Sequence, residues 1–454
     1  MTLAVVTLAA GKGSRMKSDL PKVLHKLAGK PMLAHVLGSA AALENATQHV
    51  VIGHGAEAVK EQITGFDIRW ALQAEQKGTG HAVAMAMPDV NPEATVLVLY
   101  GDVPLISTAT LQKLLAETHD GNALALLTVE LADPTGYGRI VRDDAGNIQA
   151  IVEHKDASAE QHKIREVNTG ILAVSARLLN DWLPKLSANN AQGEYYLTDI
   201  IAMAVDNGVA VRAIHPRNEH EVQGVNDRLQ LAALERVYQR GVADDLLRAG
   251  VSLADPARID VRGSLQVGSD VVIDVGCVFE GDVVLEDGVH IGPYCVVKNS
   301  HLGAGTHVEA YSHIDEAKVA ADCNIGPYAR LRPGSDLRTH ARVGNFCEVK
   351  KSVIGEGSKV NHLTYIGDAS IGKDVNVGAG TITCNYDGVN KFKTEIGDNA
   401  FIGSNSSLVA PAKIGAGATV AAGSVITKEV ADNQLAVARG KQRNIDGWER
   451  PVKK

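Results

Sequence analysis

The sequence is poor in aromatic residues and holds few cysteines. Phe, Trp and Tyr make up 4% of its 454 residues, while 45 residues are glycine. The five cysteines are odd in number and lack Cys-x-x-Cys spacing, which argues against zinc or a disulfide framework and favours reduced thiols. Apolar runs stay well short of the ~20 residues of a membrane span. The start, Met1–Ala10, has neither the basic residues nor the cleavage site of a signal peptide. We therefore predict a cytoplasmic protein without a membrane span.

An excess of positive charge is also missing. The formal net charge is −8 at neutral pH, with 22% charged residues. A nucleic-acid-binding protein usually shows a basic surface, so we expect no nucleic-acid partner. Any anionic substrate must instead meet local basic residues. The chain is too long for one hydrophobic core, so two or three domains are expected.

Residues 1 to about 225 alternate between strand and helix patterns. Apolar, β-branched runs predict buried strands at Leu3–Ala10, Val50–Ile52 and Val96–Tyr100. Helical periodicity lies between them, as in Met32–Leu43 and Leu111–Glu117. This order predicts a doubly wound, Rossmann-like α/β domain, which binds ligands at the carboxyl ends of its strands.

A single helix is predicted from Asp227 to Ala249, where leucines recur at helical spacing among charged residues and proline is absent. Gly250 is expected to end this helix. The chain therefore divides into a domain of residues 1–226, a linker helix of residues 227–250 and a domain of residues 251–454.

Beyond Val261 the period of the sequence changes to six. Aliphatic residues recur at this spacing, with short breaks, at Val267, Ile273, Phe279, Leu285, Ile291, Val297, Leu302, Val308, Ile314, Val319, Ile325, Leu331, Leu337, Val343, Val349, Ile354, Val360, Ile366, Ile371, Val377, Thr383, Ile396, Ile402, Leu408, Ile414, Val420 and Ile426. This repeat predicts a left-handed parallel β-helix of hexapeptide repeats, in which three hexads close one coil. Narrow rods of this kind usually bury their walls by forming a homotrimer. The long gap after Thr383 predicts that residues 384–393 leave the rod as a loop.

A glycine loop follows the first predicted strand. Gly11 and Gly13 allow backbone N–H groups to approach a phosphate, and Lys12 and Arg15 add positive charge. The loop has neither Walker A nor Rossmann spacing. Asp102 ends another apolar strand, where an α/β sheet exposes its ligand-binding groups.

The wider motif resembles a known family. The stretch from Leu8 to Met16, followed by Asp19-Leu20-Pro21-Lys22, resembles the signature of sugar-1-phosphate nucleotidyltransferases. The same order continues at Gln73, Gly78-Thr79-Gly80, Tyr100-Gly101-Asp102, Glu153-His154-Lys155 and Asn168-Thr169-Gly170. With the hexapeptide half, nearly the whole chain resembles the bifunctional bacterial N-acetylglucosamine-1-phosphate uridyltransferases and glucosamine-1-phosphate N-acetyltransferases.

The resemblance implies a uridylyltransferase in the first domain, which joins UTP to N-acetylglucosamine-1-phosphate and releases pyrophosphate. Arg15 and Lys22 would neutralise the triphosphate, and Asp102 and Asn226 would bind Mg²⁺, a hard ion that takes few protein oxygens beside phosphate. The UDP-sugar would contact Leu8, Ala9, Ala10, Gly11, Lys22, Gln73, Gly78, Thr79, Tyr100, Gly101, Asp102, Gly138, Glu153, Asn168 and Asn226.

The resemblance implies an acetyltransferase in the second domain, which acts on glucosamine-1-phosphate with acetyl-CoA. His362 lies two residues past the inward Val360, so it should point outward, and imidazole suits a general base near neutral pH. The sugar phosphate would contact Arg332, Lys350, Tyr365 and Asn376. Acetyl-CoA would contact Ala379, Asn385, Tyr386, Ser404, Ala422 and Arg439.

Three alternatives stay open from the residues themselves. The rod could serve only to assemble a trimer, with nucleotidyl transfer as the single activity. The first domain could use another base or sugar, because base specificity follows only from the resemblance. A non-enzymatic sugar-nucleotide sensor is disfavoured by the paired basic groups and the expected metal ligand.

Overall fold

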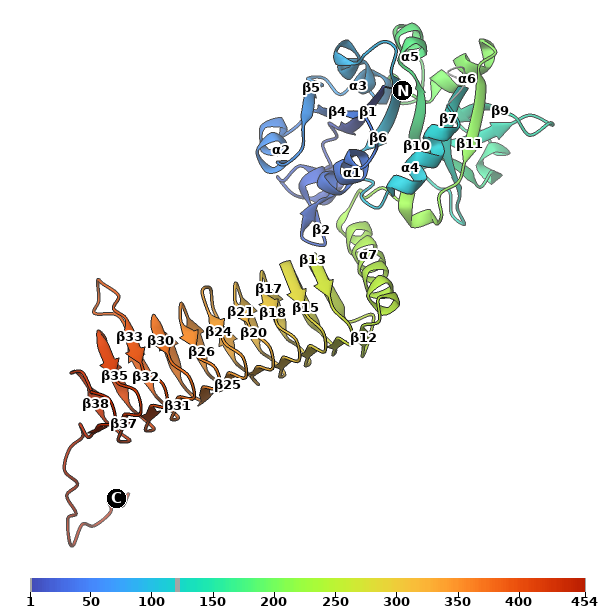
Figure 1. The fold of residues 1–454 in the computed structure, drawn as a ribbon. Coiled ribbons are helices and arrows are strands. Elements are labelled where there is room, and N and C mark those ends of the chain that lie inside the picture. The colour runs from blue at the N-terminus through green and yellow to red at the C-terminus, as the bar shows by residue number, and fades with distance from the viewer. Residues whose placement is uncertain (1, 119–122, 454) are drawn as a thin grey trace. The chain divides into compact units, whose positions relative to one another are not determined.

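The structure is a computed structural model that describes residues 2–118 and 123–453. It forms two compact units, Met1–Tyr238 and Gln239–Lys454 (Figure 1). The boundary between the units falls inside helix α7 (Arg228–Arg248), which confirms the predicted linker helix. Gly250 has a φ of 94°, a left-handed conformation that suits glycine at the end of a helix. The predicted division at residues 226 and 251 stays a prediction.

The first unit contains a mostly parallel sheet. Along the sheet the strands follow the order β11 (Ala210–Ile214), β7 (Ala123–Glu130), β10 (Glu166–Ser175), β6 (Thr95–Tyr100), β1 (Leu3–Ala9), β4 (Ala46–Ile52) and β5 (Ile68–Leu72). Strand β10 runs antiparallel to both of its neighbours. A hairpin of β8 (Arg139–Arg142) and β9 (Ile148–Val152) joins through β8 to β10. The three predicted strands are confirmed as β1, β4 and β6.

Helices cover both faces of this sheet. Side chains of α1 (Met32–Ala41) and α4 (Thr108–Ala116) pack with Leu3 and Val5 of β1 on one face. On the other face, α3 (Thr79–Ala86), α5 (Ala176–Trp182) and α6 (Asp199–Asp206) pack against Ala4 and Val6. Alternate residues of one strand thus enter different cores, as a sheet buried on both faces requires. The doubly wound fold is confirmed.

The register of the central strands sets the position of the predicted nucleotide site. Leu8 of β1 pairs with Tyr100 of β6, and Gly101 N donates a hydrogen bond of 2.9 Å to Leu8 O. Since β1 and β6 are parallel, the glycine loop after β1 and Asp102 after β6 leave the same edge of the sheet.

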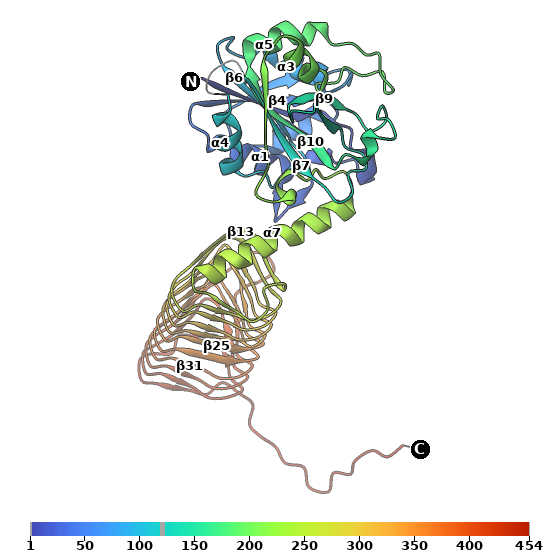
Figure 2. The same ribbon diagram turned by 90° about the vertical axis from the view of Figure 1, so that its right-hand side faces the viewer.

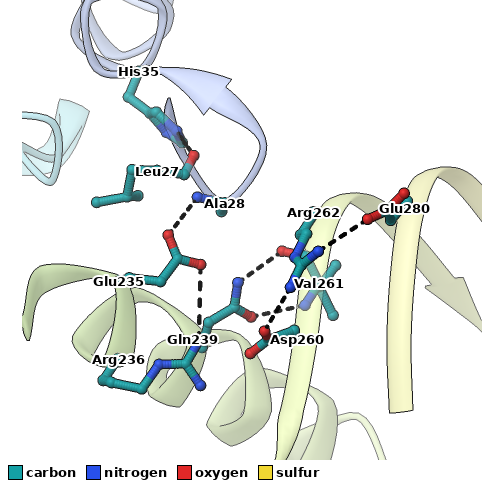
Figure 3. A network of polar contacts seen from close by, with 10 residues as sticks. All are labelled: Leu27, Ala28, His35, Glu235, Arg236, Gln239, Asp260, Val261, Arg262 and Glu280. Carbon is teal, nitrogen blue, oxygen red and sulfur yellow. Dashed lines mark hydrogen bonds and ion pairs between the residues drawn. The ribbon is translucent and has the colours of Figure 1, made fainter. Parts of the chain in front are cut away.

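Helix α7 is tied into each unit by polar contacts (Figure 3). Within the first unit, Glu235 accepts a 2.7 Å hydrogen bond from Ala28 N. Within the second, the Gln239 amide pairs with the Val261 backbone, donating at 2.9 Å and accepting at 2.8 Å. These bonds satisfy buried backbone groups that would otherwise destabilise the fold.

The second unit is a parallel β-helix whose coils stack one on another (Figure 2). It runs from β12 (Ser252–Leu253) to β39 (Leu435–Ala436), and short strands pair in parallel with the strand one coil away. The predicted inward positions are buried from Ile273 to Ile426, and Val267 is partly buried. Strands β32 (Ile382–Cys384) and β33 (Thr394–Ile396) flank a projecting loop of residues 385–393, confirming the predicted excursion (Figure 1).

Candidate active sites

One cavity of about 250 Å³ lies at the carboxyl edge of the first unit's sheet. It gathers residues from the loops after β1, β5 and β6 and from the start of α3. Its lining comprises Leu8, Ala9, Ala10, Gly11, Lys22, Val23, Gln73, Gln76, Gly78, Thr79, Ala82, Tyr100, Asp102 and Glu194. Most of the residues predicted to contact the nucleotide therefore share one wall.

Lys22 lies beneath the glycine loop. Gly13 has a φ of 61°, and a Cβ added to it would lie 2.6 Å from Lys22 Cβ, so the close approach requires glycine. The Lys22 ammonium forms an ion pair with Asp102 and donates a 3.1 Å hydrogen bond to Asn226 Oδ1. Asp102 and Asn226 are also neighbours through the backbone, because Val225 N donates to Asp102 O at 2.9 Å.

The side chains of Asp102 and Asn226 have the oxygen ligands that the predicted Mg²⁺ site requires. A carboxylate and an amide oxygen converge on one cationic group, the Lys22 ammonium. Residues 2–118 and 123–453 contain no group of three or more His, Cys, Asp or Glu side chains suited to hold a metal. A Mg²⁺ ion here would thus depend on phosphate oxygens for its other ligands, as this ion usually does with nucleotides.

The residues predicted to hold the sugar cluster around Tyr100. Gly170 packs on the Tyr100 ring, and its N donates to Asn168 Oδ1 at 2.9 Å. Asn168 N in turn donates to Gly138 O at 2.9 Å. A Cβ added to Gly138 would lie 2.8 Å from Ile151 Cγ2 and 3.4 Å from Glu153 Oε1, so glycine lets the backbone pass close to both side chains.

Burial perturbs two ionisable groups at this end of the site. It raises the pKa of Glu153 above the ordinary carboxyl value, although Thr198, which donates a 3.1 Å hydrogen bond to Glu153, acts in the opposite direction. Burial, with the charges of Glu153 and Asp102, also raises the pKa of Tyr100 well above its usual range. A half-buried carboxylate beside a neutral phenol offers an acceptor and a donor to sugar hydroxyl or amide groups.

Six of the predicted residues do not line this cavity: Arg15, Gly101, Gly138, Glu153, Asn168 and Asn226. Arg15 is exposed on the short helix Ser14–Met16, and Gly101 is buried behind the wall against Leu33, Val23 and Ala9. Conversely, Gln76 and Glu194 line the cavity without having been predicted. Glu194 is far from every motif in the sequence, so only the fold could reveal it.

In the second unit, His362 ends β28 (Lys359–His362) and is exposed, as predicted. Its Nδ1 lies 3.0 Å from Asn345 Oδ1, one coil away. Since an amide oxygen only accepts, Nδ1 must donate, which leaves Nε2 as the basic nitrogen. Asn345 was not predicted, because its role appears only when two coils are stacked.

Four of the six predicted acetyl-CoA residues, Ala379, Ser404, Ala422 and Arg439, form a column that begins at His362. Backbone hydrogen bonds of 2.7–3.2 Å join the corners of successive coils, from Gly380 N to His362 O, from Asn405 N to Ala379 O and from Gly423 N to Ser404 O. Small side chains therefore follow His362 at ~4.8 Å intervals along the rod. Arg439 joins the end of this column, donating to Ala422 O at 2.8 Å.

A cluster of three cations lies on another wall of the rod. Residues at the same position of successive coils form a column on this wall, and their charges alternate in sign: Arg262, Glu280, Lys298 and Asp315. The next two residues of the column, Arg332 and Lys350, are both cations. The neighbouring ammonium of Lys391, from the projecting loop, lowers the pKa of Lys350, and Arg332 adds to the effect. Arg332 is also paired with Glu348 at 2.7 Å, and the crowded ammonium groups of Lys350 and Lys391 attract an anion such as phosphate. Lys391 was missed because the loop returns to the rod only in three dimensions.

Other predicted residues surround this cluster. Asn385 is buried and donates a 2.5 Å hydrogen bond to Asp368, and the Tyr365 hydroxyl lies beside Gly367. Asn385 thus lies with the predicted sugar-phosphate residues, whereas Tyr386 is exposed in the loop. Asn376 lies on β31 (Asn376–Val377), which pairs with β28 and with β34 (Phe401–Ile402). This ladder of strands differs from the one that holds Tyr365 and Lys350.

Comparison with known proteins matches different families to the first and second halves of the chain. Residues 5–164 match the MobA-like NTP transferase domain, and residues 265–299 and 393–428 match the bacterial transferase hexapeptide repeats. The chain is 63% identical to "Bifunctional protein GlmU" of Cellvibrio japonicus, over 100% of both chains. It is 60% identical to the protein of that name from Marinobacter nauticus, over 99% of both chains, and 59% identical to that of Stutzerimonas stutzeri, over 100% of both.

The chain belongs to the GlmU family of bifunctional proteins. Membership confirms the predicted enzyme with a nucleotidyltransferase half and a hexapeptide-repeat transferase half. Among the described residues, the helices are all too short or too polar to cross a membrane. Sugar phosphates and nucleotides are substrates that fit this family and both sites.

Proposed function

We propose that the two halves of this chain act in sequence to make UDP-N-acetylglucosamine. The second unit acetylates glucosamine-1-phosphate with acetyl-CoA, and the first unit transfers a uridylyl group from UTP to the resulting N-acetylglucosamine-1-phosphate. The observation that carries the proposal is the pairing, on one rod, of an oriented outward histidine with a separate three-cation cluster. A rod that only assembled a trimer would need neither.

In acetyl transfer, the substrate amine attacks the thioester carbonyl and coenzyme A leaves as the thiol. His362 Nε2 takes the proton from the amine, and the hydrogen bond to Asn345 holds the imidazole in the tautomer that can accept it. Arg332, Lys350 and Lys391 bind the sugar phosphate. The pantetheine arm follows the groove of Ala379, Ser404 and Ala422, and Arg439 meets a phosphate of the coenzyme.

In uridylyl transfer, a phosphate oxygen of N-acetylglucosamine-1-phosphate attacks the α-phosphorus of UTP and pyrophosphate leaves. Such a transfer needs alignment and charge neutralisation more than a covalent nucleophile. Lys22 neutralises the α-phosphate, and Arg15, which is exposed at the glycine loop, meets the outer phosphates. Mg²⁺, held by Asp102 and Asn226, would supply further neutralisation of the triphosphate. Glu153 and Asn168 hold the sugar.

We further propose that the chain assembles as a homotrimer through its rod. Stacked aromatic rings of Tyr294, Tyr311, Tyr328 and Phe346 run along one corner of the coils, with centroids 5.0–5.2 Å apart. These side chains are 48–55% exposed, so a contiguous apolar stripe faces outward. The separation of Asn376 from Lys350 on different ladders also favours a site that a second copy completes.

We also propose that the chain works in the cytoplasm, where UTP and acetyl-CoA are available. Its five cysteines are free, and four are buried thiols, which suits a reducing compartment.

The decisive experiment supplies glucosamine-1-phosphate, acetyl-CoA, UTP and Mg²⁺ and identifies products by mass spectrometry. Wild-type protein should form UDP-N-acetylglucosamine, coenzyme A and pyrophosphate. Asp102→Ala should stop at N-acetylglucosamine-1-phosphate, whereas His362→Ala should need that compound added to proceed. Failure of the wild type to release coenzyme A would reduce the rod to a structural role.

A further inference from the structure

Gln73 is held in one orientation at the wall of the nucleotide cavity. It follows β5, is 3% exposed, and donates from its backbone N to Ile52 O at 2.8 Å. Its side-chain Nε2 lies 3.1 Å from Gly78 O and 3.1 Å from His81 Nδ1. His81 lies on α3 and does not line the cavity itself.

The partners define which end of the amide faces the cavity. Gly78 O can only accept, so the atom opposite it must be the NH₂ group of Gln73. The second hydrogen of that group points to His81 Nδ1, which therefore accepts and leaves the imidazole proton on Nε2. Both amide hydrogens are used, and Oε1 accepts no hydrogen bond from the part of the chain that the structure describes. Gln73 thus offers the cavity an acceptor.

This acceptor distinguishes between pyrimidine bases. Uracil carries a hydrogen on N3 and can donate it to Gln73 Oε1. Cytosine has a lone pair at N3, which would face the same oxygen without a hydrogen between them. A buried acceptor that meets another acceptor loses its bond and raises the free energy of the complex.

We propose that His81 is a positioning residue for base selection, because it holds the Gln73 amide with its oxygen toward the cavity and so favours uracil over cytosine. The inference rests on the proposed uridylyl transfer. An amide can rotate by half a turn with little intrinsic cost. With His81 in place, that rotation breaks the bond to Gly78, and it also either breaks the bond to His81 or forces the imidazole to move its proton from Nε2 to Nδ1; without His81, only the bond to Gly78 opposes the flip. The flipped amide would offer a donor, which matches cytosine.

The test compares His81→Asn with His81→Leu. Asparagine Oδ1 occupies the position of the histidine Nδ1 and can accept the same hydrogen, whereas leucine has the same branching without an acceptor. For each protein, kcat/KM is measured with UTP and with CTP at saturating N-acetylglucosamine-1-phosphate. We expect the UTP/CTP ratio of His81→Asn to stay near that of the wild type. In His81→Leu the ratio should fall by up to about tenfold, the effect of one hydrogen bond.

Several outcomes would overturn the inference. An unchanged ratio in His81→Leu, or an equal fall in both variants, would show that His81 does not orient the amide. His81→Phe, which keeps a ring, gives the same comparison if the leucine variant is unstable. Urea unfolding followed by the fluorescence of Trp182, which is buried in the first unit, reports the integrity of the unit that carries His81. If the wild type itself fails to use UTP, the proposed function falls; if it uses UTP and His81→Leu discriminates as before, only the role of His81 falls.

Discussion

Gly170 offers a sharp test of how the sugar end of the first site is built. It has a φ of 84°, and a Cβ added to it would lie 2.4, 2.7 and 2.9 Å from Tyr100 Cε2, Cζ and Oη. Gly146, in the turn between β8 and β9, has a φ of 87° with nothing within 4 Å of the added Cβ. Gly170→Ala and Gly146→Ala therefore share the backbone strain and differ in the clash with Tyr100.

The two costs can be estimated separately. A left-handed backbone costs alanine about 1–2 kcal/mol relative to glycine. Forcing a methyl group into a packed site costs about 1–3 kcal/mol more. Gly170→Ala should therefore lower the free energy of unfolding of the first unit by roughly 2–5 kcal/mol, against about 1–2 kcal/mol for Gly146→Ala. Since the Tyr100 ring lines the cavity, Gly170→Ala should also lower uridylyl-transfer kcat/KM, and acetyl transfer should be unchanged.

Tryptophan fluorescence during urea unfolding reports on this unit. Trp182 is 1% exposed and Trp70 is partly buried, both in the first unit, whereas Trp448 is 66% exposed in the C-terminal tail. If the two alanine variants lose the same free energy of unfolding, the predicted clash is refuted, because the Tyr100 side chain could then move away from the added methyl group at no cost in free energy. Normal uridylyl transfer in Gly170→Ala would refute the role of the ring in the site.

The remaining predictions concern charged and ionisable groups. Asp102→Asn should abolish uridylyl transfer and leave acetyl transfer near normal, as coupled assays of pyrophosphate and coenzyme A would reveal. Burial raises the pKa of Glu153 in the folded state, so stability should fall as pH rises from the ordinary carboxyl pKa through the raised one. Glu153→Gln should remove this fall and raise the urea midpoint at neutral pH, while weakening UDP-sugar binding measured by calorimetry. His362→Ala should lower acetyl-transfer kcat by ~10²–10⁴ with little change in KM for acetyl-CoA; a wild-type kcat in the folded variant would remove it as the base. Lys391→Met should raise KM for glucosamine-1-phosphate about tenfold at similar kcat, and an unchanged KM would place the phosphate elsewhere.

Local patterns were enough to predict most of the fold. The spacing of six reports which side chains point into the rod, because each strand and turn of a coil repeats that spacing whatever lies around it. The alternation of apolar strands and helices in the first half depends equally on short-range periodicity. Residues that end strands, such as Asp102, could be predicted as site residues because strand ends and loops can be read from the chain.

Contacts between distant residues depend on the tertiary structure. His362, Ala379, Ser404 and Ala422 are separated by 17, 25 and 18 residues, yet they form one column because the projecting loop takes up the extra residues without disturbing the stacking. The same loop brings Lys391 to Lys350. The sequence by itself determined which residues point inward and where strands end, since those properties are periodic and local. Only the fold decided which outward side chains meet, because that depends on how coils and strands pair across intervals that no local pattern encodes.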